Sequence, residues 1–247
     1  MCHRGGVGAT GATPHTCVAD LRGPIGALLD AQRNRWTSNL RAAPSTVGRL
    51  RVLLLFAHPS AQSFNRAIYE TAVRALEDAG HDVEHVDLYA AGFVPAMSPA
   101  ERRAYESDEP VLDPQVARHI ELIRWCEALV FVYPTWWSSM PAIMKGWLER
   151  TMVPGVGFTF DQRTGKIRAS LNNVRRVVGI STYGSSRRQV FLQTDGGRRT
   201  LSRALRMSAW RARPRLTWLG LYSMDTATDA DRAAFLEKVR RTLGGLR

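Results

Sequence analysis

An uninterrupted apolar run, residues 128–133, is followed at once by a proline and two nearby tryptophans, and this stretch constrains the fold more than any other. The run shows no apolar–polar alternation, which is typical of a strand covered on both faces in the middle of a parallel sheet. Pro134 ends the strand, and Pro141 fits the first turn of a helix whose apolar side chains recur at helical spacing. Residues 134–139 should therefore form a loop at the carboxyl end of a central strand, where open α/β sheets bind ligands.

Trp136 and Trp137 are adjacent in this loop. Two neighbouring indoles are costly to leave in water and hard to bury together in one core, so a flat ligand lying against the loop would explain both. A tricyclic isoalloxazine ring is such a ligand. The alternative is that both tryptophans pack beneath the helix that follows.

The rest of the chain alternates strands and helices, which predicts an α/β fold. Periodicity and capping residues predict strands at 50–57, 82–88, 128–133, 174–181 and 216–222, and helices at 66–79, 98–105, 113–125, 195–209 and 229–243, with a further helix from Pro141. Residues 153–160 read as a long connection, in which Phe158 and Phe160 either line a substrate space or pack in the fold. Residues 49–247 should form one domain, whereas residues 1–48, rich in glycine, alanine, threonine and proline, should form a disordered extension.

A second ligand-binding turn is predicted where the first strand ends. That strand passes through a polar turn into a helix that Ser63 or Asn65 can cap. Unpaired N–H groups and the helix dipole then point at one spot, which makes an anion site. His58 either binds the anion or orients the turn. Because parallel strands end at the same edge, this turn should meet the loops that follow Tyr133 and Ser181.

The formal charge is +12, and most of the excess lies in residues 161–247. A positive field attracts dinucleotides and phosphates as well as nucleic acid, but this segment has no recognised nucleic-acid motif, so no nucleic-acid partner is expected. No apolar run reaches the roughly 18 residues of a membrane span. We expect a cytoplasmic protein without membrane insertion, because the first 30 residues show no secretory pattern either.

Three cysteines without a Cys-x-x-Cys spacing indicate neither a disulfide framework nor a zinc site. Cys126 lies in an apolar run and should be a buried thiol. Cys2 and Cys17 each have a histidine close by in the sequence, but the usual four-ligand requirement makes a metal site there unexpected.

Two segments resemble the NAD(P)H:quinone oxidoreductases of DT-diaphorase type, in the flavodoxin-like superfamily. The first carries Ala57-His58-Pro59 and Ser63-Phe64-Asn65, and the second carries Pro134, Trp136-Trp137, Met140-Pro141-Ala142 and Lys145-Gly146-Trp147, followed by Arg150 and Pro154-Gly155. The resemblance extends over about residues 50–245 and is diffuse after Gly184. It implies an α/β, flavodoxin-like three-layer sandwich with a five-stranded parallel sheet in the order 2-1-3-4-5.

The resemblance also implies a flavin site at the three strand ends. The cofactor-binding residues would be His58, Ser63, Phe64, Asn65, Pro134, Thr135, Trp136, Trp137, Ser181, Thr182, Tyr183 and Gly184. His58 and Ser63 would bind the flavin phosphates, whereas Phe64 would lie near the ribityl chain or the ring edge. Backbone N–H groups of residues 182–184, with Arg187 or Arg188, are candidates to stabilise negative charge on the reduced ring. Tyr183 is the candidate catalytic side chain.

Such a protein would be a flavin-dependent NAD(P)H dehydrogenase (quinone). The flavin of such an enzyme takes a hydride from NAD(P)H and passes two electrons to a quinone-like acceptor in the same space, which implies ping-pong turnover. Chain length and the turn at residues 63–65 favour FAD over FMN, and the arginine excess favours NADPH over NADH. The resemblance also implies a homodimer.

The chain departs from the family pattern at the proton donor. Some family members have a tyrosine and a histidine beyond the fourth strand that assist proton delivery, but this chain has no histidine after His119. Water would then deliver the protons, or the acceptor is an azo dye, a nitro compound or a free flavin. A further alternative is a regulatory or ancillary flavodoxin-like subunit of a potassium efflux system, in which binding to a transporter matters more than turnover.

Overall fold

The computed structural model describes residues 48–247 apart from residues 106, 108 and 162. The predicted disordered extension therefore lies outside the described residues except for Gly48, and Cys2 and Cys17 lie outside them too. Within the described part, no helix is both long enough and apolar enough to cross a bilayer.

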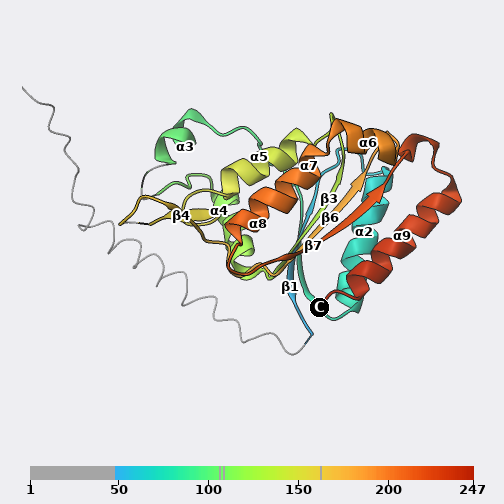
Figure 1. Ribbon diagram of the computed structural model, residues 1–247, viewed down its shortest axis with the longest axis horizontal. Helices are drawn as coiled ribbons and strands as arrows, with labels where there is room; N and C mark the ends of the chain where they lie inside the picture. Colours follow the sequence, from blue (N-terminus) through green and yellow to red (C-terminus); the bar gives the residue numbers. More distant parts are fainter. Residues whose placement is uncertain (1–47, 106, 108, 162) are drawn as a thin grey trace, which may run out of the picture.

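Five parallel strands form the central sheet (Figure 1). They are β1 (Arg51–Phe56), β2 (Asp82–Asp87), β3 (Ala128–Pro134), β6 (Arg176–Thr182) and β7 (Arg215–Leu221), in the order β2-β1-β3-β6-β7. This confirms the predicted order 2-1-3-4-5, counted over the strands of the main sheet. Strand β3 pairs with β1 on one side and with β6 on the other, and every one of its residues is buried, as the unbroken apolar run predicts.

Helices cover both faces of the sheet and complete three layers (Figure 1). The first face is covered by α4 (Pro114–Trp125), α5 (Ala142–Thr151) and a segment that runs from α7 (Gly196–Arg199) through a π-helical turn (Thr200–Ala204) to α8 (Leu205–Ser208). The second face is covered by α2 (Phe64–Asp78) and α9 (Asp229–Gly244). Two short helices, α3 (Pro99–Ala104) and α6 (Arg187–Gln193), and a 3-10 turn (Met224–Thr226) lie in the connections.

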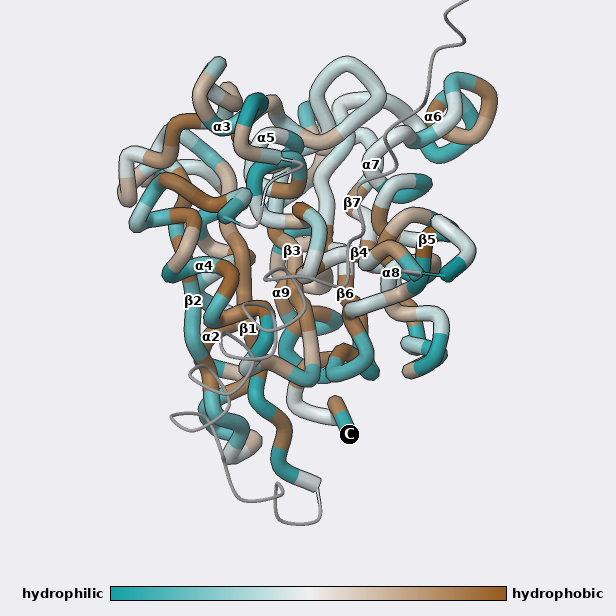
Figure 2. The backbone as a smooth tube through the Cα atoms, turned by 90° about the vertical axis from the view of Figure 1, so that its left-hand side faces the viewer, coloured by the Kyte–Doolittle hydropathy of each residue, from teal (hydrophilic) through white to brown (hydrophobic). Residues whose placement is uncertain are grey.

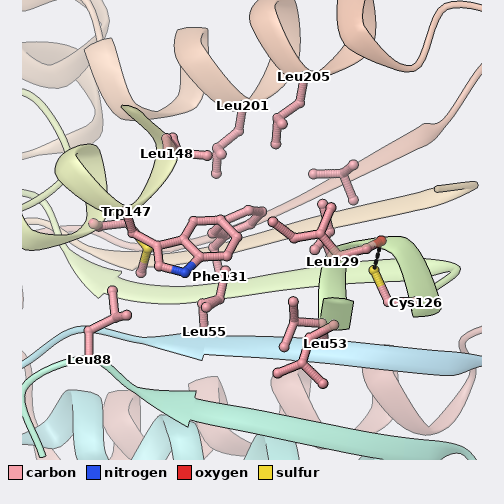
Figure 3. Close-up of a cluster of buried hydrophobic side chains, with 14 of the residues drawn as sticks. Leu53, Leu55, Leu88, Cys126, Leu129, Phe131, Trp147, Leu148, Leu201 and Leu205 are labelled. Carbon is pink, nitrogen blue, oxygen red and sulfur yellow. Dashed lines mark hydrogen bonds between the residues drawn. The ribbon is translucent and has the colours of Figure 1, made fainter. Parts of the chain in front are cut away.

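The core consists of two apolar clusters, one on each face, because alternate side chains of β1 and β3 point in opposite directions and both sets are apolar. Figure 2 accordingly colours the middle strands mainly as hydrophobic. On the first face, the indole of Trp147 meets the ring of Phe131 edge-on, with 6.3 Å between centroids (Figure 3). Cys126 lies in the same cluster, where its thiol donates to the Ile123 carbonyl at 3.4 Å and burial raises its pKa. This confirms the predicted buried thiol.

Gly179 of β6 makes room for a tryptophan on the neighbouring strand. Gly179 and Trp218 lie opposite each other in the sheet register. A Cβ atom at residue 179 would lie 2.1 Å from the indole carbon Cζ3 of Trp218, closer than real contacts allow. The absent side chain therefore lets the indole lie flat beside the sheet.

Two connections differ from the sequence prediction. Residues 153–170 form a small antiparallel hairpin of β4 (Phe158–Phe160) and β5 (Ile167–Ala169) instead of a plain loop. Its turn is closed locally, because the carboxylate of Asp161 accepts N–H bonds from residues 163 and 164. The single helix predicted at 195–209 is interrupted by the π-helical turn, and α6 was not predicted at all.

Candidate functional site

The three predicted loops meet at the carboxyl edge of the sheet, as parallel pairing of β1, β3 and β6 requires. Side chains tie them together: Asn65 Nδ2 donates to Thr182 Oγ1 at 2.9 Å, and the hydroxyls of Thr135 and Ser181 lie 2.8 Å apart. The Thr135 N–H also donates to the Thr182 carbonyl at 2.8 Å. The rings of His58 and Trp136 lie 5.9 Å apart, so the first loop also reaches the tryptophan loop.

The loop after β1 is held by bonds within itself. Ser63, and not Asn65, caps α2: its hydroxyl accepts the Arg66 N–H at 3.2 Å and donates to the Ser60 carbonyl at 2.9 Å. His58 Nδ1 accepts the Ser60 N–H at 3.0 Å. The histidine therefore orients this turn, which was one of its two predicted roles, and its Nε2 makes no hydrogen bond with the described residues.

Asn65 carries an unpaired polar atom at this edge. The residue is only 3% exposed, and while Nδ2 bonds Thr182, its Oδ1 has no partner among the described residues. Leaving a buried acceptor unsatisfied costs about 1–3 kcal/mol, and such atoms in native proteins need an explanation. A ligand with a hydrogen-bond donor would satisfy it.

The tryptophan loop is a tight turn with a strained backbone. Trp136 and Ser139 exchange two backbone hydrogen bonds, at 2.9 and 3.0 Å, and the two residues between them, Trp137 and Ser138, have φ angles of 48° and 58°. Both central residues with positive φ are the pattern of a type I′ turn, which glycine and asparagine prefer. A bulky residue in this region costs about 1–3 kcal/mol, and such strain clusters at functional sites.

This turn projects the indoles outward. Trp137 is fully exposed and Trp136 is 41% exposed. The alternative that both pack beneath the following helix is therefore wrong. Pro134 ends β3 in a buried position just before the turn, so the strand holds the indoles at the sheet edge.

The loop after β6 is built around a buried tyrosine. The Tyr183 hydroxyl donates to Asp195 Oδ2 at 2.5 Å and accepts the indole N–H of Trp218 at 3.0 Å. Its ring stacks on Tyr222 at 4.6 Å between centroids. Burial, and next the hydrogen bond with Asp195, raise the pKa of Tyr183 far above its ordinary value.

These contacts bear on the role predicted for Tyr183. Its hydroxyl is buried and bonded to both Asp195 and Trp218, and the catalytic role stays a prediction. Its backbone N–H is also engaged, by the Leu221 carbonyl at 2.8 Å. Gly184, in contrast, is exposed, and its N–H has no partner among the described residues.

Phe64 packs against α9. The centroid of its ring lies 6.5 Å from that of Phe235 and 6.0 Å from the guanidinium carbon of Arg232. Both residues belong to α9. Arg187 and Arg188 are exposed in the first turn of α6. Of the predicted site residues, Phe64 and the two arginines are therefore the least closely joined to the rest.

Asp195 and Trp218 were missed by the sequence prediction. Asp195 begins α7 as its N-cap, accepting the Arg198 N–H at 2.8 Å, and its place before two glycines could have indicated a cap. Nothing in the sequence indicates that Trp218 donates to Tyr183, because the two residues lie on neighbouring strands far apart in the chain.

Comparisons with known proteins agree with this fold. A family model described as "Flavodoxin-like fold" matches residues 50–243. NAD(P)H dehydrogenase (quinone) 1 of Cavia porcellus is 33% identical over 151 residues, which cover 55% of this chain and 54% of that protein. Ribosyldihydronicotinamide dehydrogenase-like protein traD of Penicillium crustosum is 33% identical over 136 residues, covering 47% of this chain and 49% of that protein.

The chain thus spans about half the length of the curated relatives it matches. Among solved structures, the NAD(P)H:quinone oxidoreductase from Methanothermobacter marburgensis superposes with a TM-score of 0.66 at 26% identity, covering 81% of this chain and 100% of that one. The match to the family model takes in every strand of the main sheet and all three loops of the carboxyl edge, and on that basis the chain belongs to the flavodoxin-like fold family.

Proposed function

We propose that this protein is a flavin-dependent NAD(P)H:quinone oxidoreductase whose flavin binds at the carboxyl edge of β1, β3 and β6. The observation that carries the proposal is the turn that holds Trp136 and Trp137 exposed beside this edge at a cost in backbone strain. A planar aromatic ligand would cover apolar surface that is otherwise exposed to water.

The residues present fit a flavin in two further respects. The unpaired Oδ1 of buried Asn65 would accept a hydrogen bond from a hydroxyl of the flavin side chain. The amino terminus of α2, capped by Ser63 beside His58, suits a phosphate, because helix N–H groups and the helix dipole favour anions. A phosphate-bearing, polyhydroxylated ring compound therefore matches the chemistry of the edge.

A bound flavin would supply hydride transfer from NAD(P)H and two-electron reduction of a quinone-like acceptor. The Gly184 N–H is the candidate donor to negative charge at the ring, since its neighbour Tyr183 uses its own N–H within the sheet. Tyr183 keeps its proton in the bond to Asp195, so water would supply the protons that the reduced acceptor needs. The relatives named as quinone-dependent dehydrogenases support this acceptor class.

Reconstitution of the purified protein tests the cofactor. We expect flavin fluorescence to be quenched on titration, with FAD binding more tightly than FMN. The variant with both Trp136→Ala and Trp137→Ala should bind about tenfold more weakly or worse, because the planar contact is lost. Trp210→Ala removes another exposed indole outside the site and should change nothing. No uptake of either flavin would refute the proposal.

Turnover tests the reaction. NADPH oxidation with menadione should proceed in the isolated, reconstituted protein and should exceed oxidation of NADH. If the protein reduced azo or nitro compounds but not menadione, the proposed acceptor class would change, whereas the proposed flavin site would stand. Turnover that appears only with a membrane transporter would favour the ancillary-subunit alternative instead.

We also propose a homodimer, as the family resemblance implies. The β4–β5 hairpin carries two exposed apolar side chains, Phe160 and Ile167, away from the proposed flavin edge, which supports a buried partner surface there. Sedimentation velocity should give twice the chain mass, and Ile167→Glu should shift the protein to monomer. A monomeric wild-type protein would refute this part of the proposal.

A further inference from the structure

The turn that carries Trp136 and Trp137 is held by the segment between α6 and α7, which follows β6 in the chain. The Gly196 N–H donates to the Ser138 carbonyl at 2.7 Å, and the Ser138 hydroxyl lies 3.5 Å from Gln193 Oε1. Ser138 is one of the two residues with positive φ, so both bonds act on the strained part of the turn. The connection between α6 and α7 therefore lies directly against the tryptophan turn.

The two glycines of this connection approach the tryptophan turn so closely that a side chain there would crowd it. A Cβ on Gly196 would lie 3.1 Å from the Ser138 carbonyl oxygen and from Ser139 Oγ, and a Cβ on Gly197 would lie 2.6 Å from the Tyr133 hydroxyl. Thr194, just before, also has a positive φ of 66°. The connection is thus a sharp bend whose position decides where the Gly196 N–H points.

One side chain fixes that bend to the sheet. Asp195 uses both carboxylate oxygens: Oδ1 accepts the Arg198 N–H at 2.8 Å and Oδ2 accepts the Tyr183 hydroxyl at 2.5 Å. Tyr183 is itself held by Trp218 and by stacking on Tyr222. Asp195 therefore joins the start of α7 to the rigid end of β6, and its neighbour Gly196 is placed as a result.

We infer that Asp195 is a positioning residue for the flavin-contacting tryptophan turn: through Tyr183 it holds the Gly196 N–H against Ser138 and so keeps Trp137 in its exposed orientation. The inference rests on the proposed function only in naming flavin as the ligand of the turn. The link from Asp195 to Trp137 lies within the protein and requires no ligand. Asp195 itself makes no hydrogen bond with the turn's indoles among the described residues.

Fluorine NMR of flavin-free protein labelled with 5-fluorotryptophan reads the link directly. The Trp137 signal is assigned with Trp137→Phe. We expect one sharp Trp137 signal in wild type, and a broadened or divided one in Asp195→Ala and in Tyr183→Phe, with the signal of buried Trp147 unchanged. Asp195→Asn should restore the signal only in part, because asparagine has one acceptor oxygen and can keep the cap bond or the accepted Tyr183 bond, but not both. Tyr222→Phe is the matched control and should leave Trp137 unchanged.

FAD affinity gives the functional readout on the same variants. Asp195→Ala and Tyr183→Phe should bind FAD about tenfold more weakly than wild type, as expected for loss of one charge-assisted bond. A merely structural role as the cap of α7 predicts an effect for Asp195→Ala and none for Tyr183→Phe. An unchanged Trp137 signal in both variants would overturn the inference even where wild type binds flavin, whereas a wild type that binds no flavin would refute the proposed function and leave the NMR result to decide the link.

Discussion

Both faces of the sheet bury aliphatic and aromatic side chains under helices, yet the first face also buries charged groups. On that face Arg150 of α5 donates to Glu101 Oε1 through Nε at 2.9 Å and Nη2 at 2.6 Å, to Asp113 at 2.7 Å and to the Val94 carbonyl at 2.6 Å. On the second face, the apolar cluster between α2, α9 and the sheet is accompanied by the buried neutral pair Asn65–Thr182, and the ion pair Arg66–Asp87 is partly buried, with side chains 23% and 12% exposed.

The two faces differ in buried charge because they pack different segments of the chain. The second face packs two regular helices, and apolar burial is enough for that. The first face also anchors the long connection after β2, which buries Leu88 and Phe93 in the cluster, and the buried guanidinium of Arg150 bonds three further residues of it. We therefore expect the first face to depend on charge and pH more strongly than the second, where buried His81, beside Leu246, is a group whose pKa is lowered by burial.

The largest expected effect comes from the indole at the centre of the first face. Trp147→Ala should lower the free energy of unfolding by about 3–5 kcal/mol, because a fully buried ring is replaced by a cavity. The variant also removes the indole N–H that donates to His119 Nδ1 at 3.2 Å. Urea denaturation measures the loss. Trp210→Ala, 72% exposed in wild type, should stay within about 0.5 kcal/mol, and equal losses would contradict the burial described.

The next largest effect should separate the two faces. Arg150→Met leaves Glu101 and Asp113 without their cation and should cost about 3 kcal/mol, since an uncompensated buried charge is strongly destabilising. Adding Glu101→Gln should recover part of it. Arg66→Met, at the margin of the second face, should cost about 1 kcal/mol or less because that pair is partly hydrated. Similar losses in the two single variants would remove the contrast between the faces.

Acid should loosen the first face before the second. Burial lowers the pKa of His119 below 6.5, so its contribution is present above pH 6.5 and is lost as the pH falls from there to the lowered value. Burial acts to raise the pKa of Glu101, but hydrogen bonds from Ser98 and Arg150 outweigh burial and lower this pKa below 4.5. The pKa of Asp113 is lowered below 3.8 in the same way, against burial, by bonds that include one from Arg150. Their contribution is lost as the pH falls through those lowered values.

Hydrogen exchange of backbone amides measures this. Amides of α5 should lose protection between neutral pH and pH 4.5, and further below it, while amides of α9 keep theirs until global unfolding. Glu101→Gln should flatten the lower step. Simultaneous loss of protection in both helices would show that charge does not distinguish the faces.

The smallest effect compares two helix caps. Ser98 caps α3 and Thr228 caps α9, each in a reciprocal bond with an acid three residues on. Each change to alanine should cost about 1 kcal/mol. Ser98→Ala should also weaken the acid step, because the Ser98 side chain helps to lower the pKa of Glu101, although the bond from the Ser98 backbone N–H to Glu101 Oε2 remains; Thr228→Ala should leave the step unchanged. Identical pH profiles for the two variants would contradict this.

Periodicity and caps were enough to predict the main strands and helices, because these depend on signals within about 15 residues, such as the apolar run before Pro134 and the cap at Ser63. The order of the strands came from the family resemblance, because pairing between distant segments leaves no local signal. The hairpin of β4 and β5 escaped prediction because its strands are short and mostly exposed. The helix α6 escaped because it buries no side chain and so has no amphipathic pattern.

The candidate site was predicted in its position but only partly in its internal bonds. The indoles and Asn65 lie on loops at the carboxyl edge of the sheet, as the order of strands and turns predicts, and their contact with a flavin stays a prediction. The bonds from Tyr183 to Asp195 and from Trp218 to Tyr183 join strand ends and a helix start that only the tertiary fold brings together, and the left-handed backbone at Trp137 contradicts its local preference.

The missing side chain at Gly179 restricts how this chain can diverge. Any larger residue there would push away the Trp218 ring, and any smaller ring at 218 that made space would leave the Tyr183 hydroxyl without its donor. Neither position can therefore drift alone: homologues that lose the glycine should have exchanged the tryptophan and rebuilt the tyrosine's surroundings in the same lineage. The pair thus offers a marker for sorting close relatives into those that share this arrangement beneath the edge and those that support it by other means.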